Sequence, residues 1–110
     1  MKDKKQYYKN RKYRLLKQRE CILKKYYNLK LQDYNKIKDK QNNVCAICGN
    51  INKRKHKSGK IFDLHVDHNH TTGKIRGLLC TKCNLGLGLF NDSIELLKDA
   101  TKYLINNGGY

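Results

Sequence analysis

The segment Cys45–Asn84 decides the fold, because it contains two Cys-x-x-Cys pairs. The first pair reads C-A-I-C at Cys45–Cys48, and the second lies within L-L-C-T-K-C-N at Leu78–Asn84. Two intervening residues let both thiolates of a pair reach one cation around a tight turn, and four thiolates complete the tetrahedral shell of a structural zinc ion. The spacing therefore predicts one Zn²⁺ held by four cysteines, Cys45, Cys48, Cys80 and Cys83.

Two other arrangements of these cysteines stay open, namely two disulfides and an iron–sulfur cluster. Met1–Lys5 lacks the apolar run of a signal peptide, and no stretch approaches the ~20 apolar residues of a membrane span. A reducing cytoplasm is therefore expected, which disfavours disulfides, and nothing else in the sequence suggests redox chemistry. Cys21, the fifth cysteine, is expected to be a free thiol without a role.

The charge balance points to a polyanionic partner. The 110 residues include 25 Lys and Arg against 9 Asp and Glu, a formal net charge of +16. Nucleic acid is the commonest partner for such a chain, and an anionic membrane surface is the alternative. One small domain with a modest core is expected at this length, and such domains often need a staple.

The N-terminal part predicts one basic helix over residues 3–30, which contain neither Gly nor Pro. Its apolar side chains recur at helical spacing and are expected to pack as one stripe on the body: Tyr8, Leu15, Ile22, Tyr26 and Leu29. Two roles stay open. The helix is either a solvated element or an arm that neutralises DNA phosphates with charges such as Lys12, Arg14 and Lys17. We therefore divide the chain into an arm, residues 1–30, and a zinc-stapled domain, residues 31–110.

The rest of the pattern predicts an α+β fold. A second short helix is expected from Leu31 to about Gln41, and it ends at two Asn residues, which tolerate the left-handed conformation. A polar, mobile loop follows over residues 49–60. Strands at residues 61–67 and 74–79 then form a hairpin around a Gly-containing turn, and a further helix starts at Thr81.

A final helix is expected to run to about Ile105. Asp92 has the spacing of an N-cap whose partner Glu95 reaches back in a capping box. The apolar residues beyond the cap are spaced as one buried face: Ile94, Leu97, Ala100, Thr101 and Leu104.

Asp67 and His68, at the end of the first predicted strand, together with Asn84 suggest phosphodiester hydrolysis. That reaction needs a base to activate water, a hard cation, and positive charge to hold the phosphate. Neutral His68 can act as the base, while Asp67 and Asn84 offer oxygen ligands to a Mg²⁺ that keeps several waters. Arg76, across the hairpin, is placed to grip a phosphate, and Lys74 is assigned to the same nucleic-acid contact.

Simpler roles stay open for three of these polar residues. His65 fits a structural or supporting role better than a catalytic one. His70 is expected to orient substrate, bind phosphate or hydrogen-bond the turn. Asn84 could serve only as a helix N-cap, because Asn is favoured there.

The motifs C-A-I-C-G and L-H-V-D-H-N-H-T-T-G-K-I-R-G-L-L-C-T-K-C-N-L-G-L-G resemble the recombination endonuclease VII family of phage HNH-type nucleases. The resemblance covers residues 31–105 and is closest over Val66–Gly88. It implies a small ββα-metal (His-Me finger) core on a four-cysteine zinc. By position, His68 would be the general base, Asp67 and Asn84 would hold Mg²⁺ (or Mn²⁺ in its place), and His70 would be a further active-site residue.

The resulting hypothesis is a Mg²⁺-dependent DNA endonuclease that nicks or cuts both strands, with branched DNA as a further substrate. It would act as a monomer or homodimer in the cytoplasm of a phage-infected bacterium, without a membrane partner. The family's best-known members resolve branched DNA as intertwined dimers. Because this chain stops at Tyr110, simple nicking or double-strand cleavage is expected at least as much as junction resolution. The alternatives are a non-catalytic zinc-dependent module that binds nucleic acid, and a basic protein that coats DNA or RNA.

Overall fold

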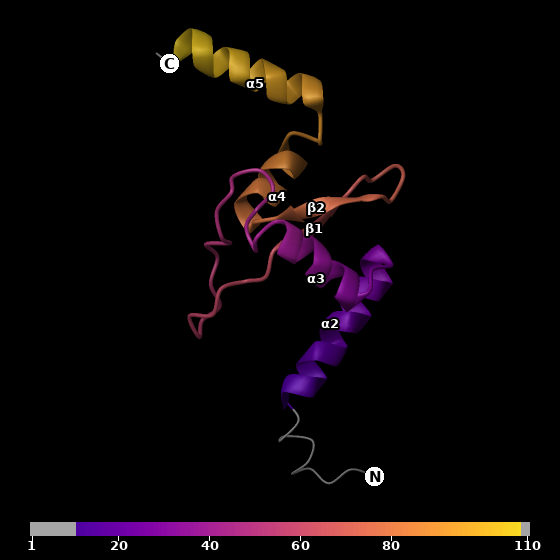
Figure 1. The fold of residues 1–110 in the computed structure, drawn as a ribbon. Coiled ribbons are helices and arrows are strands. Elements are labelled where there is room, and N and C mark those ends of the chain that lie inside the picture. The colour runs from indigo at the N-terminus through magenta and orange to yellow at the C-terminus, as the bar shows by residue number, and fades with distance from the viewer. Residues whose placement is uncertain (1–10, 109–110) are drawn as a thin grey trace, which may run out of the picture. The chain divides into compact units, whose positions relative to one another are not determined.

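The computed structural model describes residues 11–108, and Figure 1 shows the order of their elements. Four helices and one two-stranded sheet make up these residues: α2 (Arg11–Tyr27), α3 (Leu31–Lys40), β1 (His65–His68), β2 (Ile75–Leu79), α4 (Thr81–Leu89) and α5 (Ile94–Asn107). The predicted α+β class is thereby confirmed. Among these residues, none of the helices has the length and apolar character that crossing a bilayer requires.

The chain falls into two compact units, and each combines segments that are distant in sequence. Among the described residues, the first unit comprises residues 11–43 together with Val66–Leu78, and the second comprises Val44–His65 and residues 79–108. The hairpin strands connect the two units covalently. The division predicted at residue 30 stays a prediction.

In the first unit, the predicted long helix ends early. Residues 3–10 lie outside the described part of the chain, and α2 stops at Tyr27 because Asn28 adopts a left-handed conformation with φ 50°. The Asn28 N–H donates to the Lys24 carbonyl over 3.0 Å, which closes the helix. A helix interrupted here cannot carry one stripe through residue 29.

The predicted apolar stripe is also wrong within α2, where most of its described members lie. The side chain of Tyr26 is 66% exposed, and Leu15 and Ile22 are also exposed. Leu29 is buried, as is Leu23 one position beyond the stripe. Since α2 contacts α3, burial is confined to the end of α2 that adjoins the turn.

The end of α3 is fastened to β2 by a single side chain. The Gln41 side-chain amide donates to the Leu78 carbonyl, and its oxygen accepts from the Leu78 N–H, each over 2.9 Å. Gln41 thus supplies both hydrogen bonds that a neighbouring strand would supply. As predicted, α3 ends at two left-handed Asn residues, Asn42 and Asn43.

The predicted hairpin is confirmed, although its first strand is shorter than expected. β1 begins at His65, and Ile61 makes only an isolated bridge with Lys55. The Asn69 side-chain oxygen accepts from the backbone N–H groups of two turn residues, and Gly73 takes a positive φ of 76°. The turn therefore has the local chemistry of a tight connection.

In the second unit, the final helix begins one residue later than predicted. Asn91 and Asp92 both have left-handed backbones, so the N-cap is Ser93, whose Oγ accepts from the Leu96 N–H over 3.1 Å. The predicted buried face is also wrong, because no residue of α5 is buried and Ile94 is 70% exposed. Helical spacing defines an apolar face but does not supply a surface to cover it.

Candidate functional site

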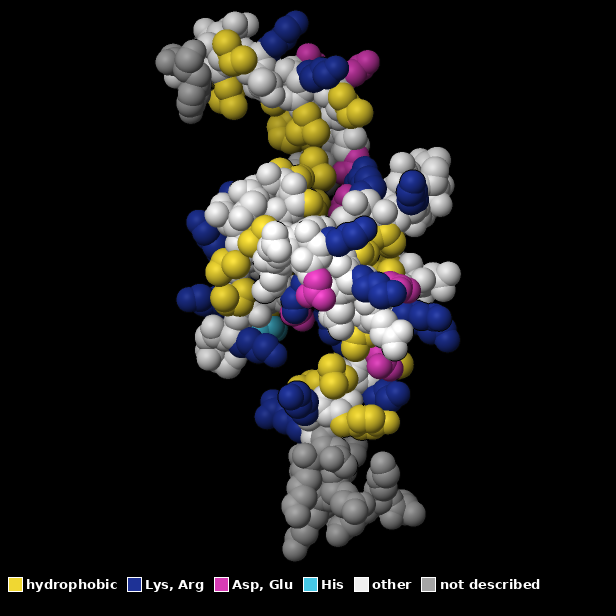
Figure 2. Space-filling view, in the orientation of Figure 1, with side chains coloured by type: hydrophobic (Ala, Val, Ile, Leu, Met, Phe, Trp, Pro, Cys, Tyr) yellow, Lys and Arg dark blue, Asp and Glu magenta, His cyan; other side chains and the backbone are white. Residues whose placement is uncertain are grey.

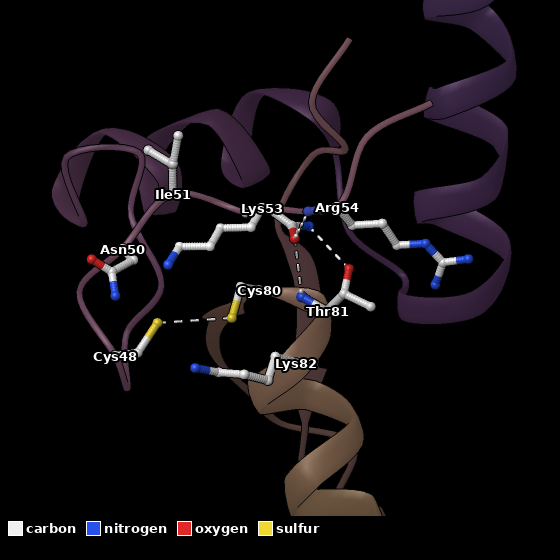
Figure 3. A pocket seen from close by; sticks show the side chains of 9 residues that line it. Cys48, Asn50, Ile51, Lys53, Arg54, Cys80, Thr81 and Lys82 are labelled. Atoms are coloured by element: carbon white, nitrogen blue, oxygen red, sulfur yellow. Dashed lines mark hydrogen bonds between the residues drawn. The ribbon is translucent and has the colours of Figure 1, made fainter. Parts of the chain in front are cut away.

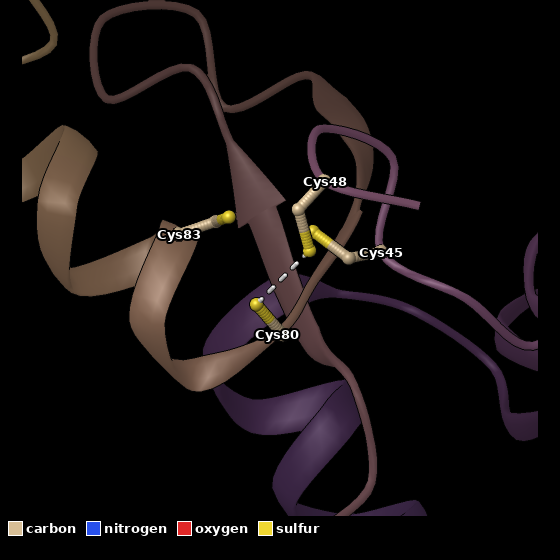
Figure 4. Close-up of side chains that lie close together, drawn as sticks. All are labelled: Cys45, Cys48, Cys80 and Cys83. Atoms are coloured by element: carbon tan, nitrogen blue, oxygen red, sulfur yellow. Dashed lines mark hydrogen bonds between the residues drawn. The ribbon is translucent and has the colours of Figure 1, made fainter. Parts of the chain in front are cut away.

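The four predicted zinc ligands converge in the second unit (Figure 4). Their sulfur atoms all lie within 4.8 Å of one another, and the Sγ atoms of Cys48 and Cys80 are 3.8 Å apart. A tetrahedron of Zn–S bonds of about 2.3 Å has edges of about 3.8 Å. The cluster therefore fits a four-coordinate Zn²⁺. All four cysteines are free thiols, which leaves the disulfide alternative without support.

Local backbone structure explains why the first pair points its thiols together. The Cys45 N–H donates to the Asn50 carbonyl over 2.9 Å, and the Gly49 N–H donates to the Cys45 carbonyl over 3.0 Å. Gly49 has φ 71°, a conformation that favours glycine. The Ile47 N–H is also 3.4 Å from the Cys45 sulfur. These bonds form a tight knuckle whose amides face a thiolate.

The second pair is placed by the start of a helix. Cys80 is the N-cap of α4, and Cys83 lies in the first turn. Unpaired N–H groups and the positive end of the helix dipole stabilise negative charge at this end. The knuckle and the helix start therefore both favour thiolates.

The titration of the thiols is consistent with a cation site. Burial raises the pKa of Cys45, but backbone N–H groups of Cys48, Cys80 and Ile47 outweigh it and lower the pKa to about 6. Burial, followed by hydrogen bonding with the other thiols, raises the pKa of Cys83 to about 12. The Cys45 thiolate thus forms readily, whereas the Cys83 thiol stays protonated. A bound metal ion would deprotonate both, because thiols that coordinate a metal ion lose their protons.

A pocket of about 260 Å³ opens beside two of these cysteines, Cys48 and Cys80. Lys53 and Lys82 extend toward the same side of it, whereas the Arg54 side chain points away (Figure 3). One Zn²⁺ and four thiolates sum to two negative charges. The two ammonium groups are suited to balance that charge.

Asn52 connects the knuckle to α4 and was missed by the sequence analysis. It is 3% exposed. Its amide nitrogen donates to the Asp63 carbonyl and to Thr81 Oγ1, and its oxygen accepts from the Thr81 N–H. His65 Nε2 lies 2.9 Å from the same Thr81 hydroxyl, which supports the structural role expected for His65. No periodic signal marks Asn52 in the sequence.

On the hairpin of the first unit, Asp67 forms a bidentate ion pair with Arg76. Arg76 Nε is 2.7 Å from one carboxylate oxygen and Nη2 is 2.8 Å from the other. Asp67 is shielded more than Arg76, with side-chain exposures of 14% and 38%. The pair fixes the Asp67 carboxylate across the two strands. An ionised carboxylate accepts hydrogen bonds on both oxygens, and Arg76 engages both of them.

His68 ends β1 and is half-buried between two other rings. Its ring centroid lies 5.5 Å from that of Tyr27 in an edge-on arrangement, and 4.7 Å from that of His70. His70 itself is exposed in the turn. The structure thus brings the two predicted active-site histidines together while leaving one of them open to solvent.

Asn84 lies in the second unit, on α4. It is the fourth residue of that helix, and its N–H donates to the Cys80 carbonyl over 3.0 Å. Because Cys80 is the cap, the alternative in which Asn84 is only an N-cap is wrong. Its side chain is half-buried, and its predicted role in metal binding stays a prediction.

The residues predicted to contact nucleic acid are spread over separate elements. Lys12 and Lys17 are exposed on α2, Arg14 is half-buried there, and Lys74 is exposed in the hairpin turn. The Lys17 ammonium lies 3.4 Å from a Glu20 oxygen, and this neighbour raises the pKa of Lys17. Figure 2 shows dark blue Lys and Arg side chains spread over much of the visible face, with acidic side chains scattered among them.

The chain is similar in sequence to two phage proteins. Gene 59 protein of Mycobacterium phage L5 is 42% identical over 81 residues, which cover 73% of this chain and 46% of that protein. Gene 59 protein of Mycobacterium phage D29 is 43% identical over 79 residues, 71% of this chain and 44% of that protein. The chain thus spans about half the length of the curated relatives it matches.

The family match covers most of the chain. No solved structure matches it significantly. Residues 20–106, which include both cysteine pairs and the whole hairpin, match the profile of recombination endonuclease VII. The chain belongs to the recombination endonuclease VII family.

Proposed function

We propose that the chain is a Mg²⁺-dependent DNA endonuclease that hydrolyses phosphodiester bonds. One observation carries the proposal. Asp67 and His68 end β1, on a hairpin that leads directly into zinc-ligand candidate Cys80, within the segment that matches a nuclease family. A purely structural zinc module has no need for this acid–imidazole pair.

The proposed architecture is an HNH-type, His-Me finger core, made of the hairpin and α4 and stapled by zinc. The order β1, β2, α4 supports it, because two strands and a helix follow one another with only one residue between β2 and α4. Zinc has a structural role here, since four thiolates leave no open coordination position.

His68 is the proposed general base. Its ring is positioned by Tyr27 and His70 and is only half-buried, so a water molecule can reach it. Imidazole is neutral and able to accept a proton near neutral pH. His70, exposed beside it, is the proposed second active-site residue, which orients the phosphate or the attacking water.

Asp67 and Asn84 are the proposed Mg²⁺ ligands. Carboxylate and amide oxygens match the ligand preference of Mg²⁺, which keeps several waters when it has few protein ligands. When bound, the ion would stabilise charge on the leaving oxygen. Arg76 orients Asp67 through its two hydrogen bonds and, with Lys74, supplies positive charge for the phosphate.

Cleavage of supercoiled plasmid tests the proposal directly. We expect the wild type to nick or linearise DNA only with added Mg²⁺ or Mn²⁺, and His68→Ala to lose at least 10²-fold in rate, as removal of a general base does. Tyr103→Ala is the matched control, because it removes an exposed aromatic ring on α5, outside the proposed site and outside the basic segment 53–62. Zinc content and circular dichroism verify that both variants are folded. Wild-type rates for His68→Ala would remove its assigned role.

The basic charge and the zinc cluster also suit the alternative, a non-catalytic zinc-dependent nucleic-acid-binding module. It predicts retarded DNA mobility without cleavage of plasmid or of a four-way junction under any divalent ion. The junction is tested as a second substrate, because branched DNA is a further substrate expected of the proposed nuclease. Cleavage of either substrate that depends on His68 excludes the binding module.

A further inference from the structure

The connection between α3 and β1 contains a defined turn at residues 53–62, which we call the basic finger (Figure 1). The Phe62 N–H donates to the Arg54 carbonyl over 2.9 Å, and the His56 N–H donates to the Lys60 carbonyl over 2.8 Å. Lys55 and Ile61 form an antiparallel bridge between these bonds. The finger is therefore a short hairpin-like element within the segment predicted to be a polar, mobile loop.

Side-chain packing on one face holds the two arms of the basic finger together. The Arg54 guanidinium lies 5.0 Å from the centroid of the Phe62 ring. The His56 ring meets the same ring edge-on, with centroids 3.9 Å apart. Contacts of this kind add stability beyond the area they bury. They keep the backbone in place and lower the entropy lost when the finger binds a partner.

The basic finger concentrates charge. It contains five Lys and Arg residues and no Asp or Glu among ten positions. The side chains at residues 53–61 are all exposed. Two well-defined ion pairs elsewhere, Lys17–Glu20 and Arg76–Asp67, involve none of these residues. A cluster of exposed cations on a stiff support is the electrostatic pattern of a phosphate-binding surface.

We propose that the basic finger docks on the DNA backbone and binds phosphates through Lys55, Lys57 and Lys60. This inference rests on the DNA substrate of the proposed function and adds a contact surface in the second unit. Lys53 is excluded, because it reaches toward the thiolate pocket (Figure 3). A membrane surface fits less well. The finger has only two apolar side chains, Ile61 and Phe62, and Phe62 is already covered by its neighbours.

The salt dependence of DNA binding tests the proposal without relying on cleavage. Binding of a 30-bp duplex is followed by fluorescence anisotropy between 50 and 300 mM salt, without added Mg²⁺. The test variant is Lys55→Gln/Lys57→Gln/Lys60→Gln in the full chain. The matched control, Lys40→Gln/Lys98→Gln/Lys102→Gln, removes the same charge from exposed positions on helices α3 and α5.

We expect the finger variant to lower the slope of log K against log salt by about 2 to 3, since each phosphate contact contributes about 0.9. At 0.1 M salt, each lost contact corresponds to an affinity drop of up to about eightfold. The control is expected to change the slope by less than 1. Equal effects of both variants, or wild-type binding by the finger variant, would overturn the proposal. The proposal would also be overturned if the finger variant bound DNA normally but no longer bound vesicles of anionic phospholipid.

The two proposals fail separately. A chain that binds through the basic finger but never cleaves refutes the nuclease and leaves the finger in place. A chain that cleaves normally while the finger variant binds like wild type refutes the finger alone.

Discussion

The zinc cluster and the hairpin site are built in different ways, although they adjoin one another in sequence. At the cluster, each cysteine pair is shaped by bonds within five residues, such as those of Gly49 and Ile47. At the hairpin, Asp67 is placed by Arg76 across the strands, and His68 by the ring of Tyr27 on α2. A local motif can specify its own geometry, whereas the hairpin site depends on packing of the whole first unit.

The largest expected effect is on the cluster. We predict that Cys80→Ser unfolds the second unit, because a structural Zn²⁺ contributes on the order of 10 kcal/mol of folding free energy. Thermal melting and zinc content measure the change. Cys21→Ser is the matched control, since Cys21 is a free, exposed thiol, and it is expected to melt like wild type. A Cys80→Ser protein with wild-type melting would disprove the zinc assignment.

The next effect concerns the support of the hairpin. Gln41→Ala leaves the N–H and carbonyl of Leu78 without partners in a position that is 0% exposed. Two buried groups without hydrogen bonds cost about 2–6 kcal/mol. We therefore expect a lower free energy of unfolding in urea denaturation, with zinc still bound to the second unit. Gln32→Ala, at an exposed position of α3, is the control. Equal stabilities of the two variants would show that the two hydrogen bonds between Gln41 and Leu78 contribute little to stability.

The same contrast explains which features the sequence could predict. Cys-x-x-Cys spacing and the Asn pair after α3 encode their own geometry, so the cluster and the helix end were predictable. The hydrogen bonds between Gln41 and Leu78 join residues 37 positions apart, and no sequence periodicity marks such a contact. The stripe failed within α2 because helical spacing does not supply a surface to cover it: Ile22 and Tyr26 are exposed, while Leu29, beyond the turn at Asn28, is buried. The residue types of Asp67, His68 and Asn84 suggested a hydrolytic site from the sequence alone. The ion pair between Asp67 and Arg76 could be found only in the structure.

Lowering the pH should weaken zinc binding, because protons compete with zinc for the thiols of the cluster. With pKa values of about 6 for Cys45 and about 12 for Cys83, the metal-free chain at pH 7 has the first thiol ionised and the second protonated. Zinc must then displace at least the Cys83 proton. Zinc affinity is therefore expected to rise about tenfold per pH unit or more between pH 6.5 and 8.5.

Below about pH 6 the Cys45 thiolate is protonated as well, so the loss of zinc becomes steeper. Competition with a chromophoric chelator at several pH values measures the slope. Above pH 6 the lowered pKa of Cys45 favours its thiolate, whereas the raised pKa of Cys83 keeps that thiol protonated up to about pH 12. Zinc binding therefore releases protons, and zinc affinity rises with pH. An affinity that does not change over this range would contradict the four-thiolate site.

The smallest expected change in stability lies at the ion pair of the hairpin. Because Arg76 is more than a third exposed, Arg76→Gln should change the free energy of unfolding by no more than about 1 kcal/mol. Its functional effect is expected to be larger. The guanidinium occupies both Asp67 oxygens, so its removal should lower the Mg²⁺ concentration that half-saturates cleavage. The rate at saturating Mg²⁺ should fall, since a phosphate-binding charge is lost.

Cleavage rates at graded Mg²⁺ concentrations separate these two effects. Lys74→Gln is the natural comparison, because it removes a neighbouring exposed charge without touching Asp67. It should lower the rate and leave the Mg²⁺ requirement unchanged. If both variants have the same Mg²⁺ dependence, Asp67 does not bind the ion, and its pair with Arg76 serves only to hold the two strands together.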